Sequence, residues 1–285
     1  MIWPASDVTK QINIDKFYSF FEVHRDSGFS FPGETHNFWE CVYVLNGSIL
    51  ASGDERVYSL TKGEIIFHKP MELHKYLVEA TEGADLLIFS FSLEGPLTEA
   101  LKNKVFCLSD EQQTLVDFML RYVRKKLGEL PMAIPELPEH QYLLAFDKHP
   151  AYSQILTTYV YQLILSLIGD GSIATVSTAP DAKIFRKAVN YLNNQIADQP
   201  SVPEIAAFCN TSEATLKRIF DKYAGISIHK YFVKMRINVA TELLQNGFGV
   251  SEVAEKLGFS GQAYFSAAYK RETGINPSEI GHVRN

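Results

Sequence analysis

Cysteine is scarce in this sequence, which has only Cys41, Cys107 and Cys209 among its 285 residues. Three cysteines, odd in number and far apart, do not form a disulfide framework, and they favour a reducing compartment. The first residues, Met1 to Pro4, are not a charged segment ahead of an apolar run, so no secretory signal peptide is predicted. We therefore expect a cytoplasmic protein.

A long apolar run is also missing. The most apolar helical stretch, residues 152–168, carries serine, threonine or glutamine at six positions. It is too short and too polar for a membrane span, and we expect no membrane partner. Its apolar residues recur at helical spacing and form a broad stripe. This stripe packs either within the chain or against a second subunit, and the sequence does not separate the two.

Positive charge is in deficit over the whole chain, with 27 Lys and Arg against 33 Asp and Glu. The deficit is confined to one part. Residues 182–285 hold 13 basic and 9 acidic residues, whereas residues 1–181 hold 14 and 24. This asymmetry predicts a basic C-terminal domain attached to an acidic body. We place an N-terminal domain at residues 1–172, a small polar linker at 173–181 and the C-terminal domain at 182–285.

The N-terminal domain begins with short aromatic and β-branched segments separated by turns such as Asn46-Gly47. This pattern is typical of an antiparallel sandwich or small barrel. Helices are expected at residues 109–128 and 152–168, with the proline-containing residues 129–150 as a connecting loop. The expected strands are 18–23, 40–45, 48–51, 56–60, 64–67 and 86–91.

The C-terminal domain contains two segments of the same design, residues 200–225 and 250–274. In each, a serine (Ser201 or Ser251) is expected to cap a short helix, and a tight turn leads to a longer helix with one apolar face. This is the helix-turn-helix arrangement. Residues 227–245 have a strong helical pattern and link the two units. A further helix is expected at 183–196.

The C-terminal segment resembles the DNA-binding domain of the AraC/XylS family of bacterial transcription regulators. The resemblance covers about a hundred residues with their order and spacing intact. It runs through Ile205-Ala206, Ser212, Leu216 to Phe220, Gly225, Tyr231, Arg236, Ala240, Leu243-Leu244, Val253-Ala254, Gly258-Phe259, Tyr264-Phe265, Lys270, Gly274 and Pro277.

In the N-terminal domain, residues 33–40 together with Gly47, Gly63, Pro70 and His74 resemble the two signature motifs of the cupin barrel. A barrel of this kind is the sensor domain common in AraC-type regulators. The expected fold is therefore α+β: a cupin-like antiparallel β-barrel with two helices, then an all-α double helix-turn-helix domain.

The resemblance implies a transcription regulator, not an enzyme. Its expected partners are double-stranded DNA, a small-molecule effector such as a sugar or other small metabolite, a second copy of the chain and RNA polymerase. No cofactor and no catalytic residue is expected. The sequence does not specify the effector, or whether transcription is activated or repressed.

By the same resemblance, the first recognition helix is residues 212–223. The second has Gly261, Ala263 and Ala267 where polar or basic side chains are usual, so we expect the first unit to carry more of the base specificity. Solvated helix faces and a second unit that does not bind remain alternatives. The expected DNA-contacting residues are Ser212, Glu213, Ala214, Thr215, Lys217, Arg218, Ser260, Gln262, Ala263, Ser266 and Lys270.

His36, Glu40 and His74 have the spacing of cupin metal ligands. Phe38, however, stands where the second histidine of a His-x-His pair is expected, so we predict no metal and assign these residues to an effector pocket. Its aromatic walls are predicted to be Phe38, Tyr43 and Tyr76. A cupin-type metal-dependent enzyme with an accessory helical domain is the alternative. A third reading is a constitutive DNA-binding protein whose barrel only dimerises.

Overall fold

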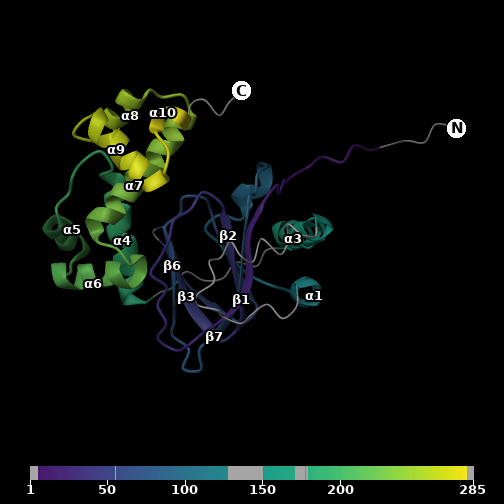
Figure 1. Ribbon diagram of the computed structural model, residues 1–285. Helices are drawn as coiled ribbons and strands as arrows, with labels where there is room; N and C mark the ends of the chain where they lie inside the picture. Colours follow the sequence, from purple (N-terminus) through teal and green to yellow (C-terminus); the bar gives the residue numbers. More distant parts are fainter. Residues whose placement is uncertain (1–5, 55, 128–149, 171–176, 178, 281–285) are drawn as a thin grey trace.

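We analysed a computed structural model of the chain, which describes residues 6–54, 56–127, 150–170, 177 and 179–280. The loop predicted at 129–150, apart from Pro150, and most of the predicted linker lie outside these residues. The described part has a β-sandwich near the N-terminus, two helices on one side of it and a helical domain on the other (Figure 1).

The sandwich consists of two antiparallel sheets. The order of strands is β1-β7-β2-β5-β8 in one and β4-β3-β6 in the other. The predicted antiparallel β domain is confirmed, and within the described residues its strands form two separate sheets, not one closed barrel. Strands β6 and β8 were not predicted. Their bounds are β1 Phe17–Arg25, β2 Trp39–Asn46, β3 Ser48–Gly53, β4 Arg56–Thr61, β5 Glu64–His68, β6 His74–Val78, β7 Ala84–Phe91 and β8 Val105–Cys107.

Both faces of the five-stranded sheet are buried. On β2, Val42 and Val44 lie in the cluster between the two sheets, whereas Cys41 and Tyr43 lie in the cluster on the outer face. Successive side chains of a strand point to opposite faces, which explains this division. It also explains why β2 has a continuous apolar run instead of an alternating pattern.

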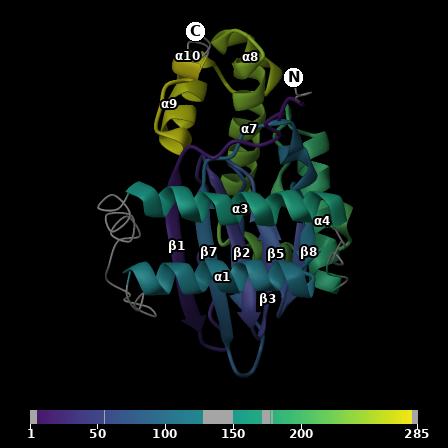
Figure 2. The same ribbon diagram turned by 90° about the vertical axis from the view of Figure 1, so that its right-hand side faces the viewer.

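The outer face of the five-stranded sheet is covered by α1 (Asp110–Leu127) and α3 (Pro150–Asp170). The two helices lie side by side across the strands (Figure 2). Both were predicted, with α3 starting two residues earlier and ending two residues later than expected. A short 3-10 helix, η1 (Pro96–Ala100), precedes β8. None of the described helices is long and apolar enough to cross a membrane.

The C-terminal domain begins with α4 (Pro180–Asn194), three residues earlier than expected. The first helix-turn-helix unit is α5 (Val202–Cys209) and α6 (Glu213–Ala224), and the second is α8 (Val250–Lys256) and α9 (Gln262–Thr273). The long helix α7 (Ile228–Gln245) joins them, and α10 (Pro277–Ile280) follows. The predicted order of helices is confirmed.

The caps of the two short helices differ. The Ser201 hydroxyl accepts from the main-chain N–H of Glu204, whose carboxylate in turn accepts from Ser201, so α5 begins with a capping box. Helix α8 begins after Gly249, and no side chain caps it. Ser251 lies inside α8, and the prediction that it caps the helix is wrong.

Helix α7 holds the two units together. Its first half contributes Ile228 and Tyr231 to the core of the first unit, and its second half contributes Ile237 and Leu244 to the core of the second. Between them, the buried Arg236 donates from Nε to the carbonyl oxygen of Ile196 at 2.9 Å and from a terminal nitrogen to that of Asp198. The two units are therefore held in fixed positions on one helix, α7.

The C-terminal domain packs directly on the three-stranded sheet. Leu50, Val57 and Leu73 of the N-terminal domain share one buried cluster with α4, α5, α6 and α7. The main-chain N–H of Ser177 also donates to the carbonyl oxygen of Val57 at 2.7 Å. This interface was not predicted, and it places the first helix-turn-helix unit next to the sandwich.

Candidate functional sites

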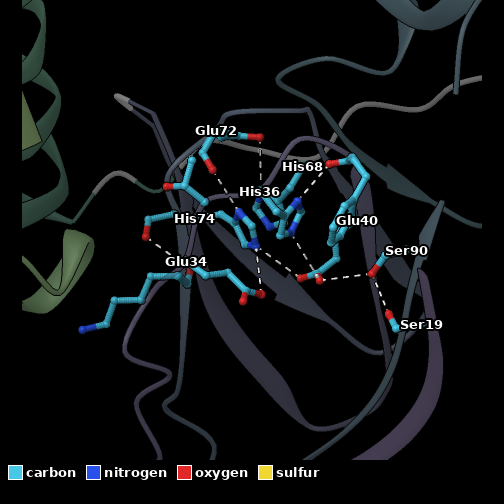
Figure 3. Close-up of polar contacts among 12 residues, drawn as sticks. Ser19, Glu34, His36, Glu40, His68, Glu72, His74 and Ser90 are labelled. Carbon is cyan, nitrogen blue, oxygen red and sulfur yellow. Dashed lines mark hydrogen bonds and ion pairs between the residues drawn. The ribbon is translucent and has the colours of Figure 1, made fainter. Parts of the chain in front are cut away.

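Four polar side chains meet at one end of the sandwich (Figure 3). Glu40 is on β2 and His74 on β6, so one comes from each sheet, while Glu34 and His36 come from the segment before β2. His74 Nε2 lies 3.3 Å from a Glu40 oxygen and 3.5 Å from a Glu34 oxygen. His36 Nε2 lies 3.6 Å from the other Glu40 oxygen.

Main-chain hydrogen bonds position these side chains. Glu34 and His74 exchange two backbone hydrogen bonds of 3.0 and 3.1 Å, which hold the segment against β6. His36 Nδ1 lies 3.0 Å from the carbonyl oxygen of Phe38, and His74 Nδ1 lies 3.1 Å from that of Glu72. Because a carbonyl oxygen can only accept, each Nδ1 carries a proton and donates it. Each Nε2 is thus the nitrogen that faces the carboxylates.

The electrostatics of the cluster follow from its burial. Burial alone would raise the pKa of the Glu40 carboxyl, but the adjacent His36 and His74 outweigh it and hold that pKa far below its usual range. Burial alone would lower the pKa of His74, whereas Glu34 and Glu40 together raise it to about 10. The cluster therefore keeps a charged carboxylate inside the protein. Ser90 also contacts Glu40, at 3.4 Å.

A second pair, His68 and Glu72, borders the cluster. The His68 ring stacks on His74 with 4.4 Å between centroids, and its Nδ1 lies 3.4 Å from a Glu72 oxygen. Burial, with the nearby His74, lowers the pKa of His68. Burial would raise the pKa of Glu72, but its contact with His68 and the charges of His74 and Lys69 lower that pKa overall. Like Glu34, these two residues were not among the predicted pocket residues.

Most of the predicted pocket residues come together. Phe38 stacks on His36 at 3.8 Å, and Tyr76 follows two residues after His74, on the same face of β6. Tyr43 is a correction: it lies three residues after Glu40 on β2 and therefore faces α1 and α3. The sequence analysis placed the second histidine of a His-x-His pair at Phe38. In the structure a polar neighbour of His36 is Glu34, two residues before it.

Helix α6 exposes the predicted DNA-contacting residues of the first unit. Glu213, Ala214, Lys217 and Arg218 are exposed and Thr215 is half-buried. Ser212 is the N-cap, since its hydroxyl accepts from the N–H of Thr215 at 3.1 Å. Two charges are paired within the domain. Lys217 lies 3.5 Å from Glu213, and Arg218 lies 3.1 Å from Asp181 on α4.

Helix α9 exposes a less charged surface. Ser260, Gln262, Ala263 and Lys270 are exposed and Ser266 is half-buried. Tyr264 was expected on the apolar face of this helix, but it is 48% exposed, so that expectation is wrong. It lies near the start of α9, two residues after Gln262, and is a candidate contact that the sequence pattern missed, because Phe265, Ala268 and Tyr269 are the residues that α9 buries in the core.

Comparison with known proteins finds a matching family for the N-terminal part of the chain and another for the C-terminal part. Residues 17–103 match the family described as the AraC-like ligand binding domain, and residues 205–282 match a helix-turn-helix domain family. The uncharacterized HTH-type transcriptional regulator YidL of Escherichia coli (strain K12) is 29% identical over 86% of this chain and 75% of its own. The HTH-type transcriptional activator RhaR of Salmonella dublin is 26% identical over 90% of this chain and 88% of its own.

Among solved structures, ToxT from Vibrio cholerae O395 matches 95% of this chain and 97% of its own at 14% identity and a TM-score of 0.38. The two matched families give a ligand-binding domain followed by a helix-turn-helix domain, and the two relatives match 86% and 90% of the chain. The chain belongs to the AraC-type family of transcription regulators. The relatives are named as regulators, and the enzyme alternative has no support from them.

Proposed function

We propose that α6 and α9 bind neighbouring stretches of one DNA duplex and that a small polar effector, bound in the N-terminal domain, changes this binding. The observation that carries the proposal is that both helix-turn-helix units are fixed on α7 while the first of them also packs on the sandwich. Figure 1 shows α7 between the two units. One rigid domain thus joins the effector site to the DNA-binding surface.

In this proposal α6 supplies most of the base specificity. Lys217 and Arg218 are long, exposed cations suited to guanine edges or phosphates, and their ion pairs at the surface contribute little to stability. On α9, Gln262 can offer an amide to adenine and Lys270 a phosphate contact. Ser212 contributes mainly by capping α6, which stabilises the first turn of the helix.

The effector is proposed to contact His36, Glu40 and His74, with Phe38 and Tyr76 as aromatic walls. Carboxylates and imidazoles are acceptors and donors for hydroxyl groups, and flat aromatic rings pack against the apolar faces of sugars. The pocket therefore favours a sugar or another small hydroxylated metabolite.

The segment of residues 32–36 is proposed to connect the effector site to the DNA-binding domain. It carries Glu34 and His36, and its Thr35 hydroxyl accepts from Lys234 of α7 at 3.3 Å. Lys234 also pairs with Glu272 of α9 at 3.3 Å. At the end of α6, a Cβ at Gly225 would clash with the carbonyl oxygen of Pro32, so the two backbones touch.

The interface has room to change. A cleft of about 590 Å³ lies between the domains, lined among others by Trp39, Met71, Asn190, Asn238 and Glu242. An effector that fits one arrangement of the segment better than another would shift the domains toward that arrangement, because only differential affinity moves an equilibrium.

Two further partners are part of the proposal. Phe118 on α1 and Ile155 and Leu165 on α3 are 40–46% exposed, on helices whose other faces cover the sheet, and we propose that they contact a second copy of the chain. Because the RhaR relatives are named activators, we also propose contact with RNA polymerase and activation of transcription, in the cytoplasm.

The proposal is tested by selecting duplexes from a random library with the purified full-length chain and sequencing them. We expect a motif with two elements about one helical turn apart for each chain, repeated if the chain is dimeric. Selection is then repeated with candidate sugars, which should change the recovery of the motif. A library that shows no enrichment at low salt would contradict the proposal.

A further inference from the structure

We propose that Asp181 is a positioning residue, which orients the Arg218 guanidinium so that it reads a base and not the phosphate backbone. The inference rests on the proposed function, because it takes Arg218 as a residue that contacts DNA. The observation behind it is a contact between two helices. A terminal nitrogen of Arg218, on α6, lies 3.1 and 3.3 Å from the two oxygens of Asp181, in the first turn of α4.

The contact engages one corner of the guanidinium. Among the described residues, the hydrogen bonds of this group run from that one terminal nitrogen to Asp181. Arginine has five N–H donors in a planar fork, and two of them in parallel match the O6 and N7 acceptors of guanine. The Arg218 side chain is 59% exposed, so its other donors remain accessible to a base.

Asp181 is itself held in place. Pro180 begins α4, and an acidic side chain in the first turn of a helix is stabilised by the partial positive charge there. Phe185, one turn further along α4, packs against Phe220 of α6 with 5.1 Å between ring centroids. The buried core between the two helices therefore sets the distance from the Asp181 carboxylate to Arg218.

Two other cations of α6 have looser contacts. Lys217 lies 3.5 Å from Glu213 of the same helix, and Lys222 lies 3.5 Å from Glu79 in the turn after β6. A lysine ammonium is a point charge on a flexible stem, whereas the planar fork of arginine keeps a direction when one corner is held. Of these three ion pairs, the one with Asp181 is thus the one that fixes where a donor group points.

The direction of the fork matters for specificity. Base edges carry sequence information and phosphates do not, so the same arginine can contribute to discrimination or only to affinity. A side chain that is already ordered also loses less conformational freedom when it binds. Without the Asp181 carboxylate, discrimination should fall at the one base pair that Arg218 reads.

A general charge effect predicts the opposite result. Any carboxylate beside a DNA-binding helix repels phosphates, so its removal favours binding to every duplex alike. Glu79→Gln is the matched control, because it removes the same charge from the acid that pairs with Lys222 on α6. Comparing Asp181→Asn with this variant separates positioning from repulsion.

The test uses the full-length chain and the duplex selected from the random library, together with its single base-pair variants. Fluorescence anisotropy at one fixed salt concentration gives the affinities. Arg218→Ala first identifies the base pair at which discrimination depends on Arg218. We expect Asp181→Asn to reduce discrimination at that pair about fivefold or more and to leave it unchanged at the others. Glu79→Gln should leave discrimination unchanged at every pair.

In the Arg218→Ala background, Asp181→Asn should change discrimination no further, since a positioning residue acts only through its partner. Circular dichroism confirms that each variant has folded. Full discrimination in Asp181→Asn, or tighter binding of that variant to every duplex alike, would overturn the positioning role and leave base reading by α6 standing. If Arg218→Ala itself keeps full discrimination at every pair, base reading by Arg218 fails, and the positioning role fails with it.

Discussion

Lys75 of β6 donates a hydrogen bond from Nζ to the main-chain carbonyl oxygen of Asp221, 2.8 Å away, in the last turn of α6. The Ser52 hydroxyl of β3 likewise donates to the carbonyl oxygen of Tyr223. Carbonyl groups in the last turn of a helix carry partial negative charge, and the Asp221 oxygen accepts from Lys75 in addition to the main-chain N–H of Gly225. The N-terminal domain therefore caps the C-terminal end of a recognition helix in the other domain.

We predict that Lys75→Met lowers the free energy of unfolding by about 1–2 kcal/mol, because it removes a charged donor and keeps most of the aliphatic chain. Urea denaturation of the full-length chain measures the change. Lys62→Met removes an exposed lysine in the turn between β4 and β5 and should change stability little. Equal losses in the two variants would show that the interdomain hydrogen bond contributes nothing.

Two serines near the starts of the short helices, Ser201 and Ser251, give a matched pair. Ser201→Ala should cost about 1 kcal/mol, because it removes the capping box of α5. Ser251→Ala should cost close to nothing, since that residue lies within α8 and caps nothing. Thermal denaturation of both variants checks this. A larger loss for Ser251→Ala would contradict the assigned start of α8.

Arg236→Met is predicted to be among the most damaging substitutions in the C-terminal domain. It leaves the carbonyl groups of Ile196 and Asp198 without their charged donor and removes the guanidinium from the Phe232 ring, 4.3 Å away. We expect a loss of about 2–4 kcal/mol in unfolding free energy. Arg186→Met, an exposed arginine of α4, serves as the control and should be nearly silent.

The proposed dimer surface is tested by Leu165→Glu, which places a charge on the exposed side of α3. Analytical ultracentrifugation should show a shift from dimer to monomer, since charges are depleted from the cores of such interfaces. Ile275→Glu alters a similarly exposed apolar residue in the C-terminal domain and should leave the dimer intact. A chain that sediments as a monomer before substitution would remove this part of the proposal.

The helical half of the fold was predictable because its signals are local. Periodicity located α6, α7 and α9, and Ser201 with Glu204 marked the start of α5. Strand β8 has three residues and carries little pattern of its own, while β6 begins with the polar residues His74 and Lys75, which interrupt a strand pattern. The packing of α6 on β6 depends on residues far apart in the chain, such as Lys75 and Asp221, which no local pattern pairs.

The candidate site was predicted in part for the same reason. The cupin-like spacing predicted His36, Glu40 and His74, but not Glu34, because that spacing places the second histidine of the pair at Phe38, after His36, whereas Glu34 precedes it. Tyr43 was assigned to the pocket because β2 is buried on both sides, so burial does not distinguish its two faces. Its separation of three residues from Glu40 does distinguish them, since successive side chains of a strand point to opposite faces.

The most direct test of the account is the affinity of the full-length chain for a selected duplex, measured by fluorescence anisotropy at one fixed salt concentration. We predict that Lys217→Ala and Arg218→Ala each weaken binding about tenfold or more, that Gln262→Ala weakens it less, and that Lys62→Ala leaves it unchanged. Equal losses for the α6 and α9 variants would remove the dominance of the first unit. Unchanged affinity in all of them would contradict the claim that these helices read DNA.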